Sequence, residues 1–445
     1  MKINALLLVV LAFLAGCNPR NPYTRSYVSD RVKHQTEFEM TQQKPAGKFE
    51  MPPGASLADG ITEDEAVTIA LWNNEQFQAD LAAISFAAAD VKDAGIIPNP
   101  LLQYLSPNGG IVAQAYMYFY LDQLWQRPHR IAAAKRDAAK VAENMVQRSF
   151  TLIRDVQLAY ADLSLARQRA RILGENAGIR RQMSELATSR LRNGDISELE
   201  AITAKMDSAN AMDLLMRVRQ DTSVFKYRFN TLLGLPTDTS VYLAQTEPVI
   251  AHIVTREDLL DIAYSNQPEL TASRNAIEAA GHRLGWERSR IAVLTAVLNG
   301  QNFAGTPSAE KPFPQTFDLG LRTEVPIFSW NQGKISRAKA EIEQASHNYV
   351  ALRQRVALTV SEAYARYELA VNSYQLWNTT VIPSLEQAAL LSINSYGTGD
   401  ISYLPVLEAN RQLLDARLKQ AEASAELRRS VSQMNYSLGK RILNQ

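Results

Sequence analysis

The chain has 445 residues, enough for two or three ordinary domains. Its 47 lysines and arginines nearly balance its 46 aspartates and glutamates, so its charge gives no reason to expect a nucleic-acid partner. Hydrophobic residues make up 46% of the chain, yet no internal run of about 18 apolar residues occurs, which excludes a membrane-spanning α-helix.

The amino-terminal residues predict a secretory signal that ends in a lipidation site. Lys2 precedes an apolar stretch over residues 5–14, and Ala15-Gly16-Cys17 follows. This pattern is typical of a signal peptide, here residues 1–16. The small residues before Cys17 resemble the lipobox of bacterial lipoproteins, which implies lipid, palmitate included, on the thiol and the new amino terminus. Asn18 follows and by the same analogy favours the bacterial outer membrane. The alternative is a chance cysteine at the end of an ordinary signal peptide.

The rest of the chain consists of an arm and a duplication. Residues 17–60 are polar, contain several prolines and show little periodicity, so we expect a lipidated, extended periplasmic arm. The tetrapeptide Gly-Asp-Ile-Ser begins at Gly194 and again 205 residues later at Gly399. The segment Asn230–Gly234 also recurs at the same offset, as Asn435–Gly439. These matches predict an internal duplication, with repeats over residues 61–247 and 248–440.

Each repeat shows the same order of elements: a helix, a β-hairpin, a very long helix, a turn and a returning helix. Thr62 and Glu65 form a capping-box pattern that begins the first helix, which ends near Gly95. The long helices carry apolar residues at alternating spacings of four and three, which indicates coiled-coil packing. Gly178 and Pro383 are equivalent, and we expect both long helices to bend or break there. The β-hairpin, long helix and returning helix are expected at about 101–123, 128–192 and 197–233, and again at about 292–325, 333–397 and 402–438.

The second strand of the second hairpin alternates most clearly. Phe317, Leu319 and Leu321 fall on one face, while Asp318 and Arg322 fall on the other. This alternation is typical of a transmembrane barrel strand, but a half-buried strand of a soluble sheet shows it too.

Two tryptophans favour the membrane. Trp125 and Trp330 lie just past the two hairpins, where interfacial aromatic residues are expected. Four strands cannot close a barrel, and an open sheet edge is not tolerated in lipid. Several chains must therefore contribute strands to one barrel. Two chains would give eight strands and three would give twelve, and these arguments do not decide between a dimer and a trimer.

The duplicated plan, the two Gly-Asp-Ile turns and the run Val406-Leu407-Glu408-Ala409 resemble TolC-like outer-membrane efflux proteins. The lipobox points to the lipoprotein members that serve tripartite pumps. The resemblance implies a homotrimer of α+β, mostly α, chains, with duplicated coiled-coil hairpins and one shared barrel of twelve transmembrane strands. This barrel would continue into a periplasmic α-helical barrel. The trimer would be a duct for small molecules such as drugs or metal cations, served by a periplasmic adaptor and a proton-driven inner-membrane pump.

The resemblance also assigns roles to residues at the two turns. It implies that the turns dock onto the adaptor, with the contacts made by Gly194, Asp195, Ile196, Gly399, Asp400 and Ile401. Ordinary helix-hairpin capping explains the glycines as well. It further implies that acids just past the turns narrow the pore, and the matching residues are Glu200 and Glu408. Glu200 also fits a capping box that begins at Ser197, which would explain it without a pore role.

Enzyme chemistry finds no support in the sequence. The five histidines are dispersed, and the sequence contains no phosphate-binding glycine-rich loop, serine elbow or catalytic thiol. Met212 and Met216 share a helix face and are interpreted as core residues. We therefore expect no enzyme, no metal site and no cofactor beyond the lipid on Cys17. The alternatives are a duct for type I protein secretion and a lipid-anchored periplasmic coiled-coil or adaptor protein.

Overall fold

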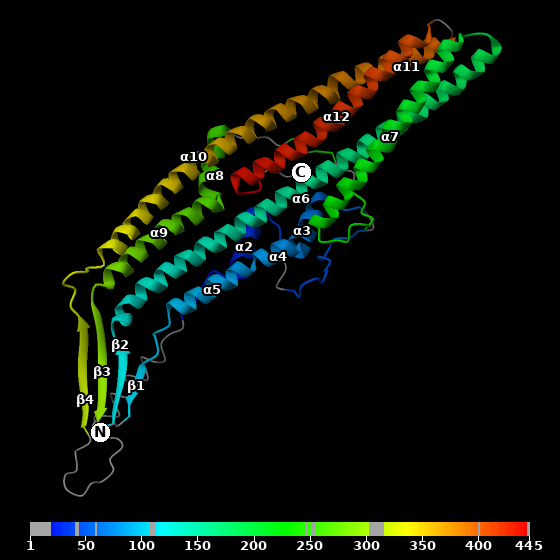
Figure 1. The fold of residues 1–445 in the computed structure, drawn as a ribbon. Helices are drawn as coiled ribbons and strands as arrows, with labels where there is room; N and C mark the ends of the chain where they lie inside the picture. Colours follow the sequence, from blue (N-terminus) through cyan, green and yellow to red (C-terminus); the bar gives the residue numbers. More distant parts are fainter. Residues whose placement is uncertain are drawn as a thin grey trace, which may run out of the picture. The chain divides into compact units, whose positions relative to one another are not determined.

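The computed structural model describes residues 19–40, 44–57, 60–106, 113–244, 247–248, 250, 255–301, 316–398 and 401–442. Cys17, Gly399 and Asp400 lie outside these residues. The chain divides into two compact units, both drawn in Figure 1. The first unit contains residues 1–28, 81–145 and 268–353, and the second contains residues 29–80, 146–267 and 354–445.

The first unit contains a four-stranded antiparallel sheet in the order β1-β2-β3-β4. The hairpin strands of the first repeat are β1 (Leu101–Leu105) and β2 (Gln114–Tyr120). Those of the second repeat are β3 (Val293–Gln301) and β4 (Thr316–Glu324). The pairing of β2 with β3 joins the two repeats into one sheet (Figure 1).

Helices α5 (Ala82–Ala94), α9 (Pro268–Ser289) and the first part of α6 (Asp122–Asn193) pack in the same unit. Helix α9 approaches α6 closely at Gly285, where a Cβ atom would lie 2.8 Å from Nδ1 of His129. Only glycine fits there without displacing the imidazole. The first part of α10 (Gln332–Leu376) also belongs to this unit.

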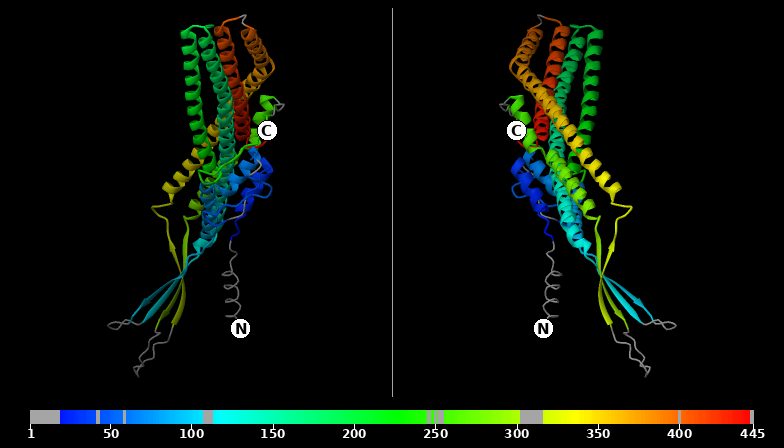
Figure 2. Two further views of the ribbon diagram at one scale, coloured as in Figure 1. Left: turned by 90° about the vertical axis from the view of Figure 1, so that its right-hand side faces the viewer. Right: turned by 90° about the vertical axis from the view of Figure 1, so that its left-hand side faces the viewer.

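The second unit contains the returning helices α7 (Glu198–Leu232) and α12 (Tyr403–Leu438), beside the second part of α6 and helix α11 (Ile382–Thr398) (Figure 2). Leu165 and Ile172 of α6 pack against Ala421 and Ala425 of α12. The alanines allow the close helix approach that the sequence predicts. The short helices α3 (Glu63–Asn73), α4 (Glu75–Asp80) and α8 (Arg256–Asn266) complete the unit.

Three features differ from the sequence predictions. Residues Arg25–Thr36 form helix α2 rather than an extended arm, because Val28 and Val32 share a face and are fully buried. The predicted helix from Thr62 to Gly95 is divided into α3, α4 and α5. Helix α6 continues through Gly178, whereas Pro383 follows a π-helical turn, η1 (Trp377–Val381).

The mostly helical α+β class is confirmed. No helix within the described residues has the length and apolar character needed to cross a membrane.

Candidate functional site

The strand register gives the sheet one apolar face. Met117 of β2 lies opposite Leu102 of β1 and Leu298 of β3, and Leu298 lies opposite Leu319 of β4. Directly paired residues in an antiparallel sheet point to the same face. The alternation that the sequence shows in β4 therefore belongs to an apolar face that extends over all four strands. Its other members include Tyr104, Ala115, Phe119, Ala296, Phe317 and Leu321.

The opposite face of the sheet is mainly polar, with Leu101, Val293 and Val297 among its few apolar residues. Tyr116 and Tyr118 stack with their ring centroids 6.3 Å apart, and the Tyr118 hydroxyl donates to Oε1 of Gln103 at 3.2 Å. Thr295 of β3 pairs with Arg322 of β4 on this face. A sheet with one apolar and one polar face suits a boundary between lipid and water.

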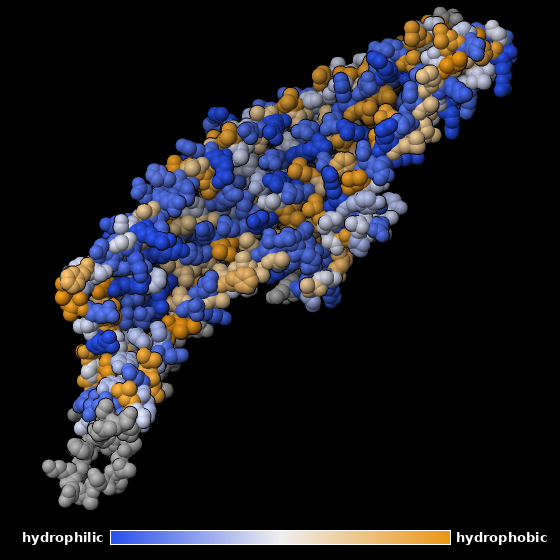
Figure 3. Space-filling view, in the orientation of Figure 1, coloured by the Kyte–Doolittle hydropathy of each residue, from blue (hydrophilic) through white to orange (hydrophobic). Residues whose placement is uncertain are grey.

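Exposed apolar residues follow the sheet. Trp330 lies between β4 and α10 together with Val325, Ile327 and Phe328, and Phe328 is 91% exposed (Figure 3). Trp125 lies near the start of α6 and donates from Nε1 to the Ser289 carbonyl oxygen at 3.2 Å. The two tryptophans thus mark the sheet-proximal ends of equivalent long helices in both repeats.

The first Gly-Asp-Ile turn is a complete Schellman motif at the end of α6. Gly194 has φ +81°, its N–H donates to the Leu191 carbonyl at 3.0 Å, and the Asp195 N–H donates to the Arg190 carbonyl at 3.0 Å. The Ser197 hydroxyl then accepts from the Glu200 N–H and caps α7. The predicted turn chemistry is therefore present at Gly194.

Comparison with known proteins finds a family model that matches part of the chain, a similar curated protein and solved structures with the same fold. The family model described as outer membrane efflux protein matches residues 259–440. The cobalt-zinc-cadmium resistance protein CzcC of Cupriavidus metallidurans is 24% identical over 391 residues, covering 86% of this chain and 91% of CzcC.

Two solved structures share the fold. The outer membrane protein VceC of Vibrio cholerae superposes with a TM-score of 0.70 at 17% identity, over 85% of this chain and 96% of VceC. The MtrE outer membrane channel of Neisseria gonorrhoeae superposes with a TM-score of 0.65 at 16% identity, over 92% and 98% of the two chains. In sequence and in fold the chain is similar to TolC-like outer-membrane efflux channels.

The isoleucines of the two Gly-Asp-Ile turns face inward. Ile196 and Ile401 both pack on a cluster formed by Ala187, Ala204 and Val406, and the clustered ends of the two hairpins are visible in Figure 2. Of the docking residues predicted from the family, the isoleucines therefore stabilise the hairpin ends. Asp195, by contrast, is exposed. Gly399 and Asp400 lie outside the described residues.

The two predicted gate acids have different surroundings. Glu200 is half-buried, and its backbone N–H bonds to Ser197, but its side chain makes no return bond to the Ser197 backbone within the described residues. The capping box predicted there is thus only half formed. Glu408 is exposed, lies 3.5 Å from Nε of Arg411 and accepts from Nε2 of Gln412 at 3.0 Å. Nearby arginine partly offsets the Glu408 charge within each chain.

A ladder of ion pairs joins α6 to α12. Asp162 accepts from Arg429 at 2.7 Å, and Arg169, seven residues later on α6, pairs with Glu422, seven residues earlier on α12. Sequence reasoning missed this ladder. The seven-residue spacing of the charges on both helices is the signal that could have revealed it.

A buried acid joins α3 to α12. Glu63 is 6% exposed and lies 3.7 Å from Nη1 of Arg428, which is equally buried. Burial raises the pKa of Glu63 to about 8, although the positive charge of Arg428 opposes this shift. Asp64, the next residue, accepts at Oδ1 and Oδ2 from the single nitrogen Nη2 of Arg441, at 3.0 and 2.9 Å.

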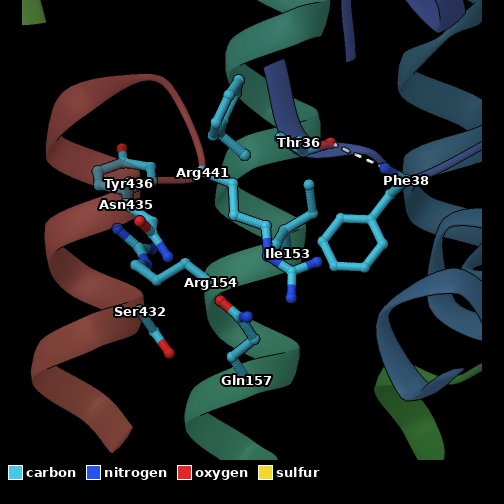
Figure 4. Close-up of a pocket in the computed structure, with 10 residues that line it drawn as sticks. Thr36, Phe38, Ile153, Arg154, Gln157, Ser432, Asn435, Tyr436 and Arg441 are labelled. Atoms are coloured by element: carbon cyan, nitrogen blue, oxygen red, sulfur yellow. Dashed lines mark hydrogen bonds between the residues drawn. The ribbon is translucent and has the colours of Figure 1, made fainter. Parts of the chain in front are cut away.

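Arg441 holds the end of the chain against the arm. Its backbone N–H donates to the Gln35 carbonyl at 2.8 Å, and its guanidinium lies 4.9 Å from the centre of the Phe38 ring. Figure 4 shows this guanidinium beside Phe38, above Gln157 of α6, in a small cavity. The arm after α2 is therefore fixed to the helical body. No sequence motif marked this contact, because its partners are far apart in the chain.

Proposed function

We propose that three copies of this chain form the outer-membrane duct of a tripartite efflux system that exports divalent metal cations. The observation that carries the proposal is the sheet. Its outer strands are β1 and β4, and neither has a second strand partner among the described residues. Since lipid does not tolerate an unpaired strand edge, β1 of one copy would pair with β4 of the next. Three copies would then close twelve strands into a barrel, the number that the family resemblance favours over eight.

The helices support the same assembly. Leu199, Ile202 and Met206 form an exposed stripe on α7, and Leu390 and Leu391 are exposed on α11. We expect the α7 surface of one copy to contact the α11 surface of the next. Because the two surfaces differ, this contact is heterologous, and it closes into a ring of three when a three-fold rotation relates the copies. Met212 and Met216 are also exposed on α7, which corrects their interpretation as core residues. In the trimer they would lie near this contact between copies.

The lipid contacts follow from the sheet. Its apolar face would meet the acyl chains, and the exposed residues Val325–Trp330 would lie at the membrane interface together with Trp125. Lipid on Cys17 would add an anchor to the outer membrane without forming any part of the channel. The body of the duct would extend into the periplasm.

The partners and the cargo follow from the family. The turns at Gly194–Ile196 and Gly399–Ile401 would meet a periplasmic adaptor, which connects the duct to a proton-driven inner-membrane pump. Glu200 and Glu408 would narrow the pore near these turns. CzcC is named for cobalt, zinc and cadmium resistance, and this chain matches it over 86% of its length, which favours divalent metals as the cargo.

Conductance and export test the proposal. Purified full-length protein in detergent should have the mass of a trimer and should form channels in a planar lipid bilayer. Deletion of the gene should sensitise cells to Co²⁺, Zn²⁺ or Cd²⁺ more than to drugs, and the intact gene should restore resistance. A monomer without conductance would exclude the duct, whereas sensitivity to drugs alone would exclude the metal cargo.

A further inference from the structure

The polar face of the sheet carries a groove where β2 runs into α6. Tyr118, Tyr120, Asp122, Thr295, Arg322 and Glu324 are among the residues that line it. The register places Tyr120 opposite Thr295, and it places Val293 opposite Glu324. Asp122 is the first residue of α6, and the preceding Leu121 still donates to the Leu294 carbonyl of β3 at 2.9 Å. Asp122 therefore reaches the groove from the side of β3 opposite Glu324, with Val293 between them. The backbones that carry these two acids are about 10 Å apart, because each strand step is about 4.8 Å.

Asp122 has one carboxylate oxygen without a partner. The residue is 5% exposed, and Oδ2 accepts from Nε2 of Gln126 at 2.9 Å and from Nε2 of Gln123 at 3.0 Å. Oδ1 is buried and has no hydrogen-bond partner among the described residues. An acid in the first turn of a helix is ordinary. A buried oxygen without a partner is not, because it has lost its hydration without gaining a hydrogen bond.

We propose that this groove holds a divalent cation, bound by Asp122 Oδ1, the Glu324 carboxylate and the Thr295 hydroxyl, with waters completing its coordination. Oxygen ligands of this kind suit divalent metals. Among the residues that line the groove, the Arg322 guanidinium offsets one of the two carboxylates and leaves one net negative charge per chain; Arg130, whose charge also acts on Asp122, is outside this lining. This leaves a weak site, and weak sites suit a duct because the cargo must leave as readily as it enters. The inference rests on the proposed function, since it gives the exported cations a contact on the polar face of the sheet.

Equilibrium dialysis of the purified full-length protein against Cd²⁺ tests the site. Wild type should bind one Cd²⁺ per chain at this site. Asp122→Asn and Glu324→Gln should each raise the dissociation constant about tenfold or more, because even indirect partners of metal ligands contribute about 10- to 100-fold. Asp318→Asn is the matched control: it removes one carboxylate from the same face of β4 outside the groove, and it should leave binding unchanged.

The outcomes separate this inference from the proposed function. Equal losses in all three variants would show a general charge effect and overturn the site, as would unchanged binding in Asp122→Asn and Glu324→Gln. Glu324 is exposed, so Glu324→Gln remains informative if Asp122→Asn does not fold. Wild-type channels that conduct without binding Cd²⁺ would refute the site and leave the duct intact. Cd²⁺ binding without conductance would refute the duct and leave the site.

Discussion

The two repeats share a backbone plan but bury different groups at equivalent positions. Thr62 caps α3, and its equivalent 193 residues later, Thr255, caps α8. The next residue is Glu63 in the first repeat, where it is buried beside Arg428. In the second repeat it is Arg256, which is exposed. The capping chemistry is thus common to both repeats, while the buried charge is particular to one.

This difference indicates which features a duplication keeps. Helix starts and apolar spacing are local, and each copy can satisfy them independently. A buried acid beside an arginine depends on what packs around it, and Glu63 meets Arg428 of α12 in the other repeat. Substitutions at Glu63 should therefore change the stability of the protein, whereas substitutions at the equivalent Arg256 should not. The following substitutions test this asymmetry.

We expect the largest effect from Glu63→Ala, which removes the acid that faces the buried Arg428. Leaving a buried charged donor without this acceptor costs about 3 kcal/mol or more of unfolding free energy. The equivalent change, Arg256→Ala, should cost less than about 0.5 kcal/mol because the side chain is exposed. Urea unfolding of the purified variants measures both values. Equal losses would show that the repeats do not differ at this position.

The second test transfers the proline between the repeats. Gly178→Pro should cost about 3 kcal/mol, because it removes the N–H that bonds to Gly174 and brings the ring against that carbonyl. Helix α6 is continuous here and has no π-helical turn to accommodate a proline. Gly178→Ala is the control and should be neutral or stabilising, since no described atom lies within 4 Å of the added Cβ. A Gly178→Pro protein as stable as wild type would contradict the prediction.

The third test is the pH dependence of stability. Glu63 has a pKa of about 8 in the folded chain and about 4.5 unfolded, so between these values the folded chain holds a proton that the unfolded chain has lost. Its contribution is fully present below pH 4.5 and is lost as the pH rises through 8. From pH 5 to 7 the loss is at most about 2–3 kcal/mol.

The groups that face Glu63 are Arg428, Asp64 and Arg441. Melting temperatures of Glu63→Gln should lack this component, whereas those of Arg256→Gln should follow the wild type. Parallel curves for wild type and Glu63→Gln would contradict the assignment.

The fourth test addresses the tip of the first repeat. Gly194→Arg should cost about 1–2 kcal/mol, because arginine must adopt a positive φ. The trimer should remain, since no described atom lies near the added Cβ, and export should be lost if the turn docks the adaptor. Gly194→Asn is the control, because asparagine tolerates this conformation. Gly399→Arg should act in the same way, and loss of the trimer in either arginine variant would show a purely structural turn.

The sequence predicts the elements whose signals are local. The capping box at Thr62 and Glu65 and the alternation around Phe317 both appear in the structure, because each depends on residues a few positions apart. Helix α2 was missed because tertiary burial of Val28 and Val32 overrides the polar, proline-containing composition around it. The Asp162–Arg429 pair was missed because its members lie 267 residues apart.

The smallest effect should come from Pro383→Ala in the second repeat. The Ile382 N–H donates to the Trp377 carbonyl, five residues back, and the missing N–H of Pro383 favours this wider turn. Alanine restores the N–H, but Ala389 is buried further along α11 and fixes the register of that helix. The π-helical turn should therefore persist, with a gain below about 1 kcal/mol. This gain in stability should slow amide hydrogen exchange over residues 377–383. A continuous α-helix in a crystal structure of the variant would show instead that the proline alone interrupts the long helix of the second repeat.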